Sequence, residues 1–518
     1  MTKAQFNDAR TRVLRGEGQT SSERYLKELC DNAFLSLWSY PGIYRDQGGG
    51  GSSSKKEGKE VCDLLVVFDR HVIIFSDKHC KFARAGDLEI NWKRWFRKTI
   101  VESARQVWGA ERWISVFPHR LFLDRACTRP FPISLPDRST TIFHRVVVAH
   151  GISETCCQLL GGSGSLAISS ELIGQEQHDV PFNVGWPEGR DKGYVHVFDD
   201  AALLFVLRTL DTVTDFVSYL TKKEALFHSG RKIAAAGEEE LLACYLRELN
   251  SDGEHDFVIP SGYEGVLFEE GHWDRFAQHP QRQAQLSANK ISYAWDKLIE
   301  RFSRHVMSGT EYFPSRLEVR DQEKILRFMA REGRTRRRLL AGALLEKLRE
   351  TPASSPGARV VEPSFPGDPY YVFVFLPRRG DTPNNEYREV RCNLLMAYCR
   401  TVKINYPEAE HVVGVATESG TVLGRSEDAV YLDASHWTEQ DQNEAEAVKQ
   451  EFGLLKTVKR SESTEEEYPS GAAIHDVAGH VSRNSQCPCG SRKRYKRCHG
   501  REIFATKIRS EVSRSSGN

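Results

Sequence analysis

VCDLLVVFDRHVIIFSDK, residues 61–78, contains two short runs of β-branched and aromatic residues on either side of the turn Asp69-Arg70. Such runs favour strands, and a two-residue connection between them predicts an antiparallel β-hairpin. Side chains alternate between the two faces of a strand, so Ser76 and Lys78 share one face while Asp77 points away from it. The hairpin is therefore expected to belong to a sheet, with polar residues close to the end of its second strand.

Helical and strand patterns alternate on both sides of the hairpin. Before it, apolar residues recur at helical spacing from Ser21 to Tyr40, the pattern ends at Pro41-Gly42, and a Gly/Ser-rich loop follows at 48–54. After it, a helix containing Trp92 and Val107 is expected. Further strands are predicted at 113–116, 120–123, 143–149 and 194–198, with a helix over 201–220. These patterns predict an α/β domain over residues 1–230.

The remainder of the chain divides into several segments. The pattern is helical over 231–352, and a segment rich in Pro, Gly and Ser over 353–368 is typical of a linker. A second, small α/β unit is expected over 369–455, followed by a flexible tether over 456–483, a cysteine-containing segment over 484–501 and a tail over 502–518. The fold class is thus α/β multidomain.

A basic cluster, Arg334-Thr335-Arg336-Arg337-Arg338, lies on one of the predicted helices. Such a run most often covers a solvated helix face, which is the favoured interpretation. Contact with the phosphates of a nucleic acid is the alternative.

Length and composition restrict the class of protein. The 518 residues include 40% hydrophobic and 28% charged residues, with a formal net charge of +1, which is typical of a soluble protein with more than one domain. No apolar run is long enough to span a bilayer, and the N-terminus lacks the apolar stretch of a secretory signal, so a cytoplasmic location without membrane attachment is expected. Nine of the twelve cysteines are scattered without the spacing of a disulfide framework and are expected to be reduced.

The segment CPCGSRKRYKRCHG holds four soft ligands within thirteen positions, Cys487, Cys489, Cys498 and His499. Zn²⁺ accepts thiolates and imidazole in a closed tetrahedron and supplies folding energy to a segment too short to bury a core. The segment closely resembles the SEC-C motif, which implies a structural zinc knuckle with these four residues as ligands, although Arg492 stands where that family usually has glycine. In the family the knuckle docks protein or nucleic-acid partners, and the resemblance implies a bacterial source.

The order of polar residues in the first domain resembles the core of the PD-(D/E)XK nuclease superfamily: a helix with Glu23, a strand with Asp63, a strand ending Ser76-Asp77-Lys78, and a helix with Gln106. The resemblance covers about residues 20–120. It implies that Asp63 binds Mg²⁺, Lys78 positions the attacking water and Gln106 helps to orient the site. Ser76 stands where the family has Asp or Glu, and serine is a poor ligand for Mg²⁺, so either Glu60 or Glu23 completes the metal shell or the domain is a degenerate nuclease.

Other residues have simpler interpretations. His196 alternates with apolar residues and is predicted to be a half-buried strand histidine, and Asp199-Asp200 mark a helix start. No Gly-x4-Gly-Lys-Ser/Thr loop occurs in the sequence, which argues against a P-loop ATPase.

Two hypotheses of function remain open. The first is a metal-dependent nuclease acting on DNA or RNA, and the alternative is a non-enzymatic adaptor that docks a protein or ribonucleoprotein partner through the zinc knuckle. Enzymatic activity and oligomeric state are left open by the sequence.

Overall fold

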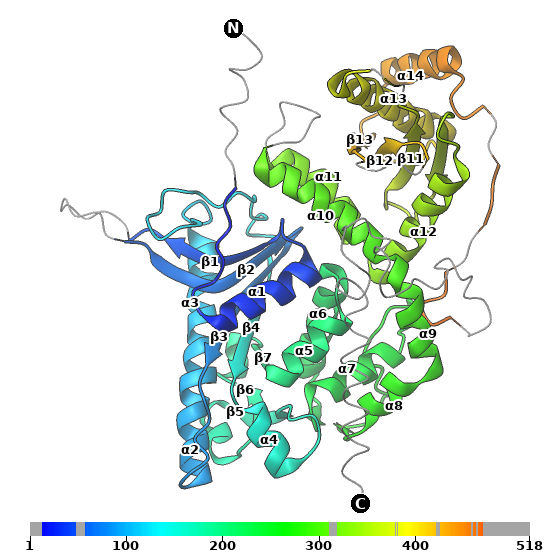
Figure 1. Ribbon diagram of the computed structural model, residues 1–518. Helices are drawn as coiled ribbons and strands as arrows, with labels where there is room; N and C mark the ends of the chain where they lie inside the picture. Colours follow the sequence, from blue (N-terminus) through cyan, green and yellow to red (C-terminus); the bar gives the residue numbers. More distant parts are fainter. Residues whose placement is uncertain are drawn as a thin grey trace, which may run out of the picture.

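The computed structural model describes residues 13–47, 57–309, 319–378, 380, 382–420, 425–456, 459–462 and 465–469. Figure 1 shows three sheets and the helices around them, with the first sheet near the N-terminal end of the chain and the third beneath α13 and α14. Mixed α/β architecture is therefore confirmed.

The first sheet contains the predicted hairpin. Its order is β1-β2-β3-β4-β7, from the strands β1 (Ser39–Arg45), β2 (Lys59–Phe68), β3 (His71–His79), β4 (Ile142–His150) and β7 (His196–Asp199). Strands β1 to β3 are antiparallel, whereas β4 and β7 run parallel to β3. Val66 lies opposite Ile73, and Asp69 in the turn has a left-handed φ of 54°. The hairpin prediction is confirmed.

Helices cover both faces of this sheet. Helix α1 (Ser21–Phe34) packs on the face that carries Phe75, whose ring centroid lies 6.4 Å from that of Phe34. Helices α5 (Asp200–Thr209) and α6 (Val213–His228) lie on the same side, and Phe216 of α6 also contacts Phe34. The opposite face is covered by α3 (Glu102–Val116), which follows α2 (Leu88–Phe96) and the π-helix η2 (Arg97–Val101).

Three local predictions for this domain were wrong. Residues 113–116 are the last turn of α3, because Val107, Ala110 and Ile114 continue its buried stripe. Residues 120–123 make only isolated bridges of Phe122 to Tyr44 and Pro130. The helix expected over 201–220 is two helices, since Thr212 caps a new helix by accepting a hydrogen bond from the Asp215 amide.

A second sheet follows in the order β6-β5-β8-β9, from β5 (Ala167–Ile173), β6 (Asn183–Trp186), β8 (Lys232–Ala235) and β9 (Gly265–Phe268). It is flanked by α4 (Ser153–Leu160), the 3-10 helices η3 (Gly174–Asp179) and η4 (Arg190–Lys192), and α7 (Glu238–Arg247). The region 231–352, predicted to be helical, therefore also contains two strands, β8 and β9, one on each side of α7 in the sequence. Each spans only four residues, which is too short for a period of two to stand out in the sequence.

Apart from α7, the helices of the predicted helical region follow β9. They are α8 (His272–Gln278), α9 (Pro280–Ala288), η5 (Asn289–Ile291), α10 (Tyr293–Ser308), α11 (Val319–Arg331) and α12 (Arg334–Glu350).

The third sheet has the order β10-β11-β12-β13, from β10 (Gly357–Val361), β11 (Tyr370–Leu376), β12 (His411–Glu418) and β13 (Glu427–Asp433). With α13 (Asn384–Asn405) and α14 (Glu439–Phe452), it forms the α/β unit expected near the C-terminus. The segment expected to be a linker contains β10, which pairs with β11. Trp295 of α10 contacts the rings of Tyr371 and Phe373, so this unit shares a core with the helical region.

Three arginines of the basic cluster 334–338 have neither the solvated nor the phosphate-binding role predicted for the cluster. Arg334, Arg337 and Arg338 are buried, and Asp296 of α10 accepts hydrogen bonds from Arg334 Nη1 at 2.7 Å and Arg337 Nη1 at 2.8 Å. Arg334 and Arg337 therefore join α10 to α12, whereas Arg338 pairs with Glu465, so none of the three is available to a phosphate backbone.

Candidate functional site

The candidate site lies where β2 and β3 part. Their paired register reaches Leu64 opposite Phe75. One residue earlier on β2, the buried Asp63 carboxylate accepts a hydrogen bond from the Asp77 amide at 2.6 Å. The carboxylate therefore satisfies a backbone donor of the neighbouring strand, which gives Asp63 a structural contact in addition to the role that the nuclease resemblance implies.

Ser76 and Lys78 lie on the face of β3 that α3 covers. Ser76 is fully buried, and its hydroxyl donates to Gln106 Oε1 of α3 at 3.1 Å. Lys78 is half-buried on the same face by strand alternation. The structure thus joins Gln106 to the position where the family has a carboxylate.

Glu23 lies in the first turn of α1, where its main contacts are those of a helix cap. Its carboxylate accepts from the Gln19 amide at 2.6 Å and from the Thr20 hydroxyl at 3.0 Å, while Thr20 Oγ1 accepts from the Glu23 amide. An acidic residue in this place stabilises a helix N-terminus. Glu23 therefore serves the fold whether or not it also binds a cation.

Three carboxylates influence one another at this end of the sheet. Burial, followed by the charges of Asp63 and Glu23, raises the pKa of Glu60 to about 7. Burial also raises the pKa of Asp63 to about 6, and the charges of Asp77 and Glu23 add to that effect. The cluster formed by Glu23, Glu60 and Asp63 is thus electronegative, and a bound cation would favour its ionised form.

The carboxylate cluster is not a closed ligand shell. A search of the described residues for three His, Cys, Asp or Glu side chains whose ligand atoms all lie within 4.8 Å of one another finds one group. That group is His144, His196 and Glu224, and it lies elsewhere.

Glu60→Gln should raise the melting temperature at pH 8 in the absence of divalent cations. The raised pKa of Glu60 means that its stability contribution is fully present below about pH 4.5 and is lost as the pH rises through about 7. We expect a gain of about 1 kcal/mol at pH 8, reduced from the value of the full pKa shift because the side chain is partly solvated, and little change at pH 4.5. Thermal melts of both proteins at the two pH values test this. Glu57→Gln, at an exposed position of the same segment, is the control.

A second polar group, not predicted from the sequence, lies on the opposite face of β3. His150 at the end of β4 contacts Asp77 Oδ2 through Nε2 at 2.9 Å and Asp200 Oδ1 through Nδ1 at 2.6 Å. Burial lowers the pKa of His150, but the hydrogen bonds to Asp200 and Asp77 outweigh it and raise that pKa to about 9. The imidazolium therefore bridges two carboxylates. Asp77 belongs to this group, as its alternation with Ser76 and Lys78 requires.

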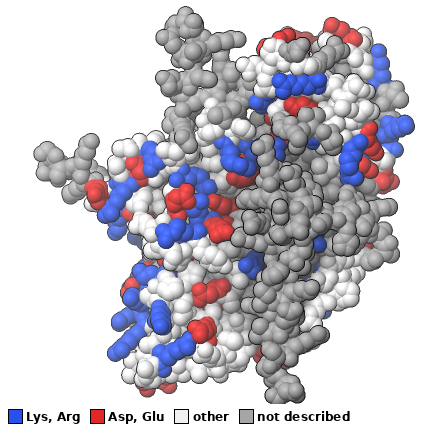
Figure 2. All heavy atoms as spheres, in the orientation of Figure 1, with Lys and Arg blue, Asp and Glu red and all other residues white. Residues whose placement is uncertain are grey.

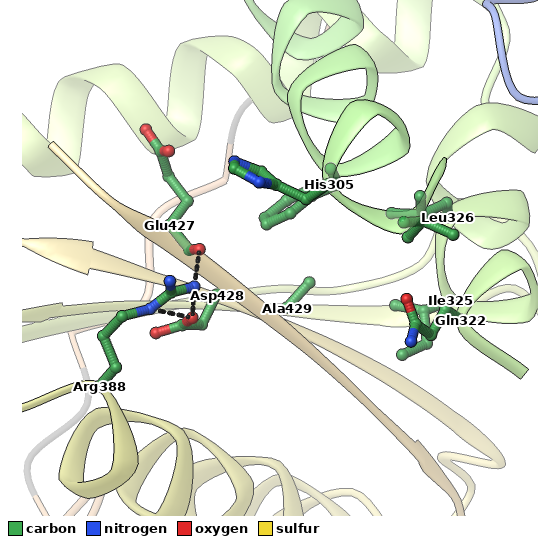
Figure 3. Close-up of a pocket in the computed structure, with 10 residues that line it drawn as sticks. His305, Gln322, Ile325, Leu326, Arg388, Glu427, Asp428 and Ala429 are labelled. Atoms are coloured by element: carbon green, nitrogen blue, oxygen red, sulfur yellow. Dashed lines mark hydrogen bonds and ion pairs between the residues drawn. The ribbon is translucent and has the colours of Figure 1, made fainter. Parts of the chain in front are cut away.

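Two hollows on the surface differ in volume and in the residues that line them. Figure 3 shows the first, which is lined by His305 and Gln322 of the helical region and by Arg388 and Asp428 of the second α/β unit. Its volume of about 50 Å³ is too small for a cofactor. The second is a groove of about 580 Å³ along α3. Its lining includes four cationic side chains, from Arg105, Arg112, Arg138 and Lys192.

Comparison with known proteins identifies one module. Residues 483–501 match the model of the SEC-C motif. The chain carries a SEC-C motif. Similar proteins include the protein translocase subunit SecA of Francisella tularensis subsp. novicida (strain U112) and of subsp. holarctica (strain LVS), each 27% identical over 122 residues. The aligned part is 23% of this chain and 12% of the relative, so the chain spans a small fraction of the length of these relatives. No solved structure matches the chain.

The SEC-C motif is a zinc-binding motif, which supports the structural zinc expected from the sequence. The predicted ligands Cys487, Cys489, Cys498 and His499 lie outside the described residues. Among the helices that the structure describes, none combines the length and apolar character needed to cross a membrane.

Proposed function

We propose that the N-terminal domain is a metal-dependent nuclease and that the SEC-C motif is a zinc-dependent docking module. The observation that carries the nuclease proposal is the group at the parting of β2 and β3. There Asp63 lies beside two further carboxylates with which it interacts electrostatically, and Ser76, Lys78 and Gln106 share one side of the sheet.

In this proposal Asp63 and Glu60 hold Mg²⁺, with Glu23 completing the shell. Mg²⁺ prefers carboxylate and water oxygens, and when bound it would stabilise negative charge on a phosphate. Lys78 would orient the attacking water and offset the charge that develops on the phosphate oxygens. Gln106 would orient Ser76 and, through it, the neighbouring Asp63.

The groove along α3 supports a polyanionic substrate. Two of the acidic side chains near its cations are already paired, since Glu111 contacts Arg145 and Glu188 contacts Lys192. Arg112 and Arg138 of the groove lining are therefore the proposed phosphate contacts. In the view of Figure 2, Lys and Arg side chains gather on the part of the surface where Figure 1 places α2, and acidic residues lie among them.

A cleavage assay tests the nuclease. Full-length protein is incubated with single- and double-stranded DNA and RNA in Mg²⁺ or Mn²⁺, alongside Asp63→Asn, Lys78→Ala and Lys81→Ala. Lys81 is exposed three residues beyond Lys78 and serves as the matched control. Loss of at least about 100-fold in rate for Asp63→Asn and Lys78→Ala, with Lys81→Ala unchanged, is expected.

Equal cleavage by all four proteins would overturn the assignment. No cleavage by the wild type on any substrate would instead favour the adaptor hypothesis, in which the domain has lost activity with its acidic residue at position 76.

The zinc knuckle has its own test. Wild-type protein should retain a chelator-resistant zinc ion with thiolate ligands, and Cys487→Ser/Cys489→Ser should lose it, because thiolates are the strongest ligands of that site. Metal analysis after gel filtration, together with the thiolate charge-transfer absorption of the Co²⁺-substituted protein, measures this. Cys157→Ser, which removes an exposed cysteine of the first domain, is the control. Unchanged Co²⁺-thiolate absorption in the double variant would contradict the ligand assignment.

A further inference from the structure

Two histidines on adjacent parallel strands point to the same side of the first sheet. His196 of β7 pairs with Val146 of β4, and His144 precedes Val146 by two residues, so both imidazoles lie on the face that α6 covers. Both side chains are almost completely buried. This is the face opposite to the one that holds Ser76 and Lys78.

Glu224 of α6 brings a carboxylate to the two imidazoles. One ligand atom from each of His144, His196 and Glu224 lies within 4.8 Å of the other two. The two imidazoles are buried, whereas Glu224 is half-buried. The cluster is therefore partly accessible to solvent on the side of Glu224.

Three of the four imidazole nitrogens in this cluster lack hydrogen-bond partners among the described residues. Neither Nδ1 nor Nε2 of His196 has a hydrogen-bond partner among the described residues, and the same is true of His144 Nδ1. A buried polar atom without a partner destabilises the folded state, so three of them in one place require an explanation.

The other nitrogen of His144 has a partner that suits a metal ligand. Nε2 of His144 lies 3.0 Å from Nδ1 of His71, which is half-buried on β3. A histidine that binds a metal usually donates its second ring N–H to a neighbouring acceptor, which fixes its tautomer. If His144 donates to His71 through Nε2, its unpartnered Nδ1 carries the lone pair that a metal ion requires.

We propose that His144, His196 and Glu224 bind a divalent transition-metal ion such as Zn²⁺. Two imidazoles and one carboxylate form a donor set typical of Zn²⁺, with a water molecule as the fourth ligand. Bonds of about 2.1 Å in a tetrahedral shell place ligand atoms about 3.4 Å apart, so side-chain shifts of about 1 Å bring this cluster to coordination distance. This site is separate from both the SEC-C motif and the proposed nuclease site.

The surrounding charges are compatible with a cation. Lys223 is adjacent in sequence to Glu224, but its ammonium pairs with the buried Glu238 at 2.5 Å. Arg145 pairs with Glu111, with Nη2 lying 2.9 Å from Oε1. Burial also lowers the pKa of His144 to about 3 and that of His196 well below its usual value, so both imidazoles stay neutral, the form that binds metal.

The site is tested by measuring metal binding to the full-length Cys487→Ser/Cys489→Ser variant. In this variant the SEC-C motif should no longer bind zinc, so it should not contribute to the signal. Co²⁺ and Zn²⁺ are the probes, measured by visible absorption and calorimetry. We expect one equivalent of Co²⁺ with the d–d bands of a low-coordinate N/O site and no thiolate charge transfer. Zn²⁺ should displace it with a dissociation constant below about 1 μM, equivalent to about 8 kcal/mol.

Glu224→Gln and His196→Asn, made separately in that background, should each weaken Zn²⁺ binding by more than about 100-fold. Glu224 is half-buried, so its variant keeps the test valid if His196→Asn does not fold. His119→Asn, at an exposed histidine of the same domain, is the matched control. Absence of Co²⁺ bands in the folded background protein would overturn the proposal, as would equal affinity in Glu224→Gln and the control. Neither outcome depends on nuclease activity.

Discussion

Replacing Asp296 by asparagine should destabilise the protein more than any surface substitution on the same helices. The Asp296 carboxylate is the shared acceptor of Arg334 and Arg337, and Arg334 also contacts Asp211 through Nε at 2.8 Å. Removing a single negative charge leaves Arg337, which is 1% exposed, without a carboxylate partner. Breaking a buried ion pair in this way costs about 3–5 kcal/mol. We expect the melting temperature to fall by about 5–10 °C.

The pH dependence of this effect follows from the pKa of Asp296. Burial opposes ionisation, but the charges of Arg334 and Arg337 outweigh burial and lower the pKa of Asp296 below its usual value. The stability it contributes is therefore present above about pH 4 and is lost only as the pH falls through the lowered pKa. The difference between the two proteins should stay constant from pH 5.5 to 8.5.

Arg349→Ala is the matched control for Asp296→Asn, because Arg349 is an exposed arginine on the same helix as Arg334 and Arg337. Thermal melts followed by circular dichroism measure both variants. A melting temperature for Asp296→Asn within about 1 °C of the control would show that the arginine network does not hold α10 and α12 together.

His150→Gln should give the second large loss of stability. His150 neutralises Asp77, whose side chain is 1% exposed, and Asp200 at the start of α5. Glutamine has one donor nitrogen in place of the two of imidazolium and carries no charge, so Asp77 would be left buried without a counter-charge. We expect a loss of about 3 kcal/mol near neutral pH.

The loss caused by His150→Gln should depend on pH in the range where His150 titrates. Because its pKa is raised from 6.5 to about 9, its contribution is complete below about pH 6.5 and disappears as the pH rises through about 9. The difference in melting temperature between wild type and variant should therefore be largest at pH 6 and small at pH 9.5.

His79→Gln is the control for this experiment. The His79 ring stacks on that of His150 with centroids 6.0 Å apart, but His79 is exposed and forms no ion pair with a carboxylate among the described residues. A pH-independent difference between His150→Gln and wild type would contradict the charged bridge.

Much of the secondary structure could be predicted from local pattern. The hairpin of β2 and β3, helix α1, and the elements β11, α13, β12 and β13 follow from runs of strand-forming residues and from helical spacing, both of which are read over neighbouring positions. The short strands β8 and β9 could not be predicted in this way, because pairing with distant residues, and not their own four-residue sequences, makes them strands.

The candidate site was predictable only in part. The sequence indicated Asp63, Ser76 and Gln106 as members of one group, and the contact between Ser76 and Gln106 agrees with it. No local pattern joins Asp77 to His150, which is 73 positions away, or His144 to Glu224, because such pairs depend on how distant elements pack in the fold.

By itself, the sequence determined the α/β character of the chain, the hairpin with its polar end, and the SEC-C motif, whose four predicted ligands are close together in the sequence. The tertiary structure alone decided which charges are buried. Arg334–Arg338 has the composition of a solvated surface, and the sequence 194–198 reads as an ordinary strand. The packing of α10 against α12 buries Arg334 and Arg337 in an ion network with Asp296. The packing of α6 against β4 and β7 places His196 in the proposed metal site. Burial removes water from these groups, and the partners that replace it come from distant parts of the chain.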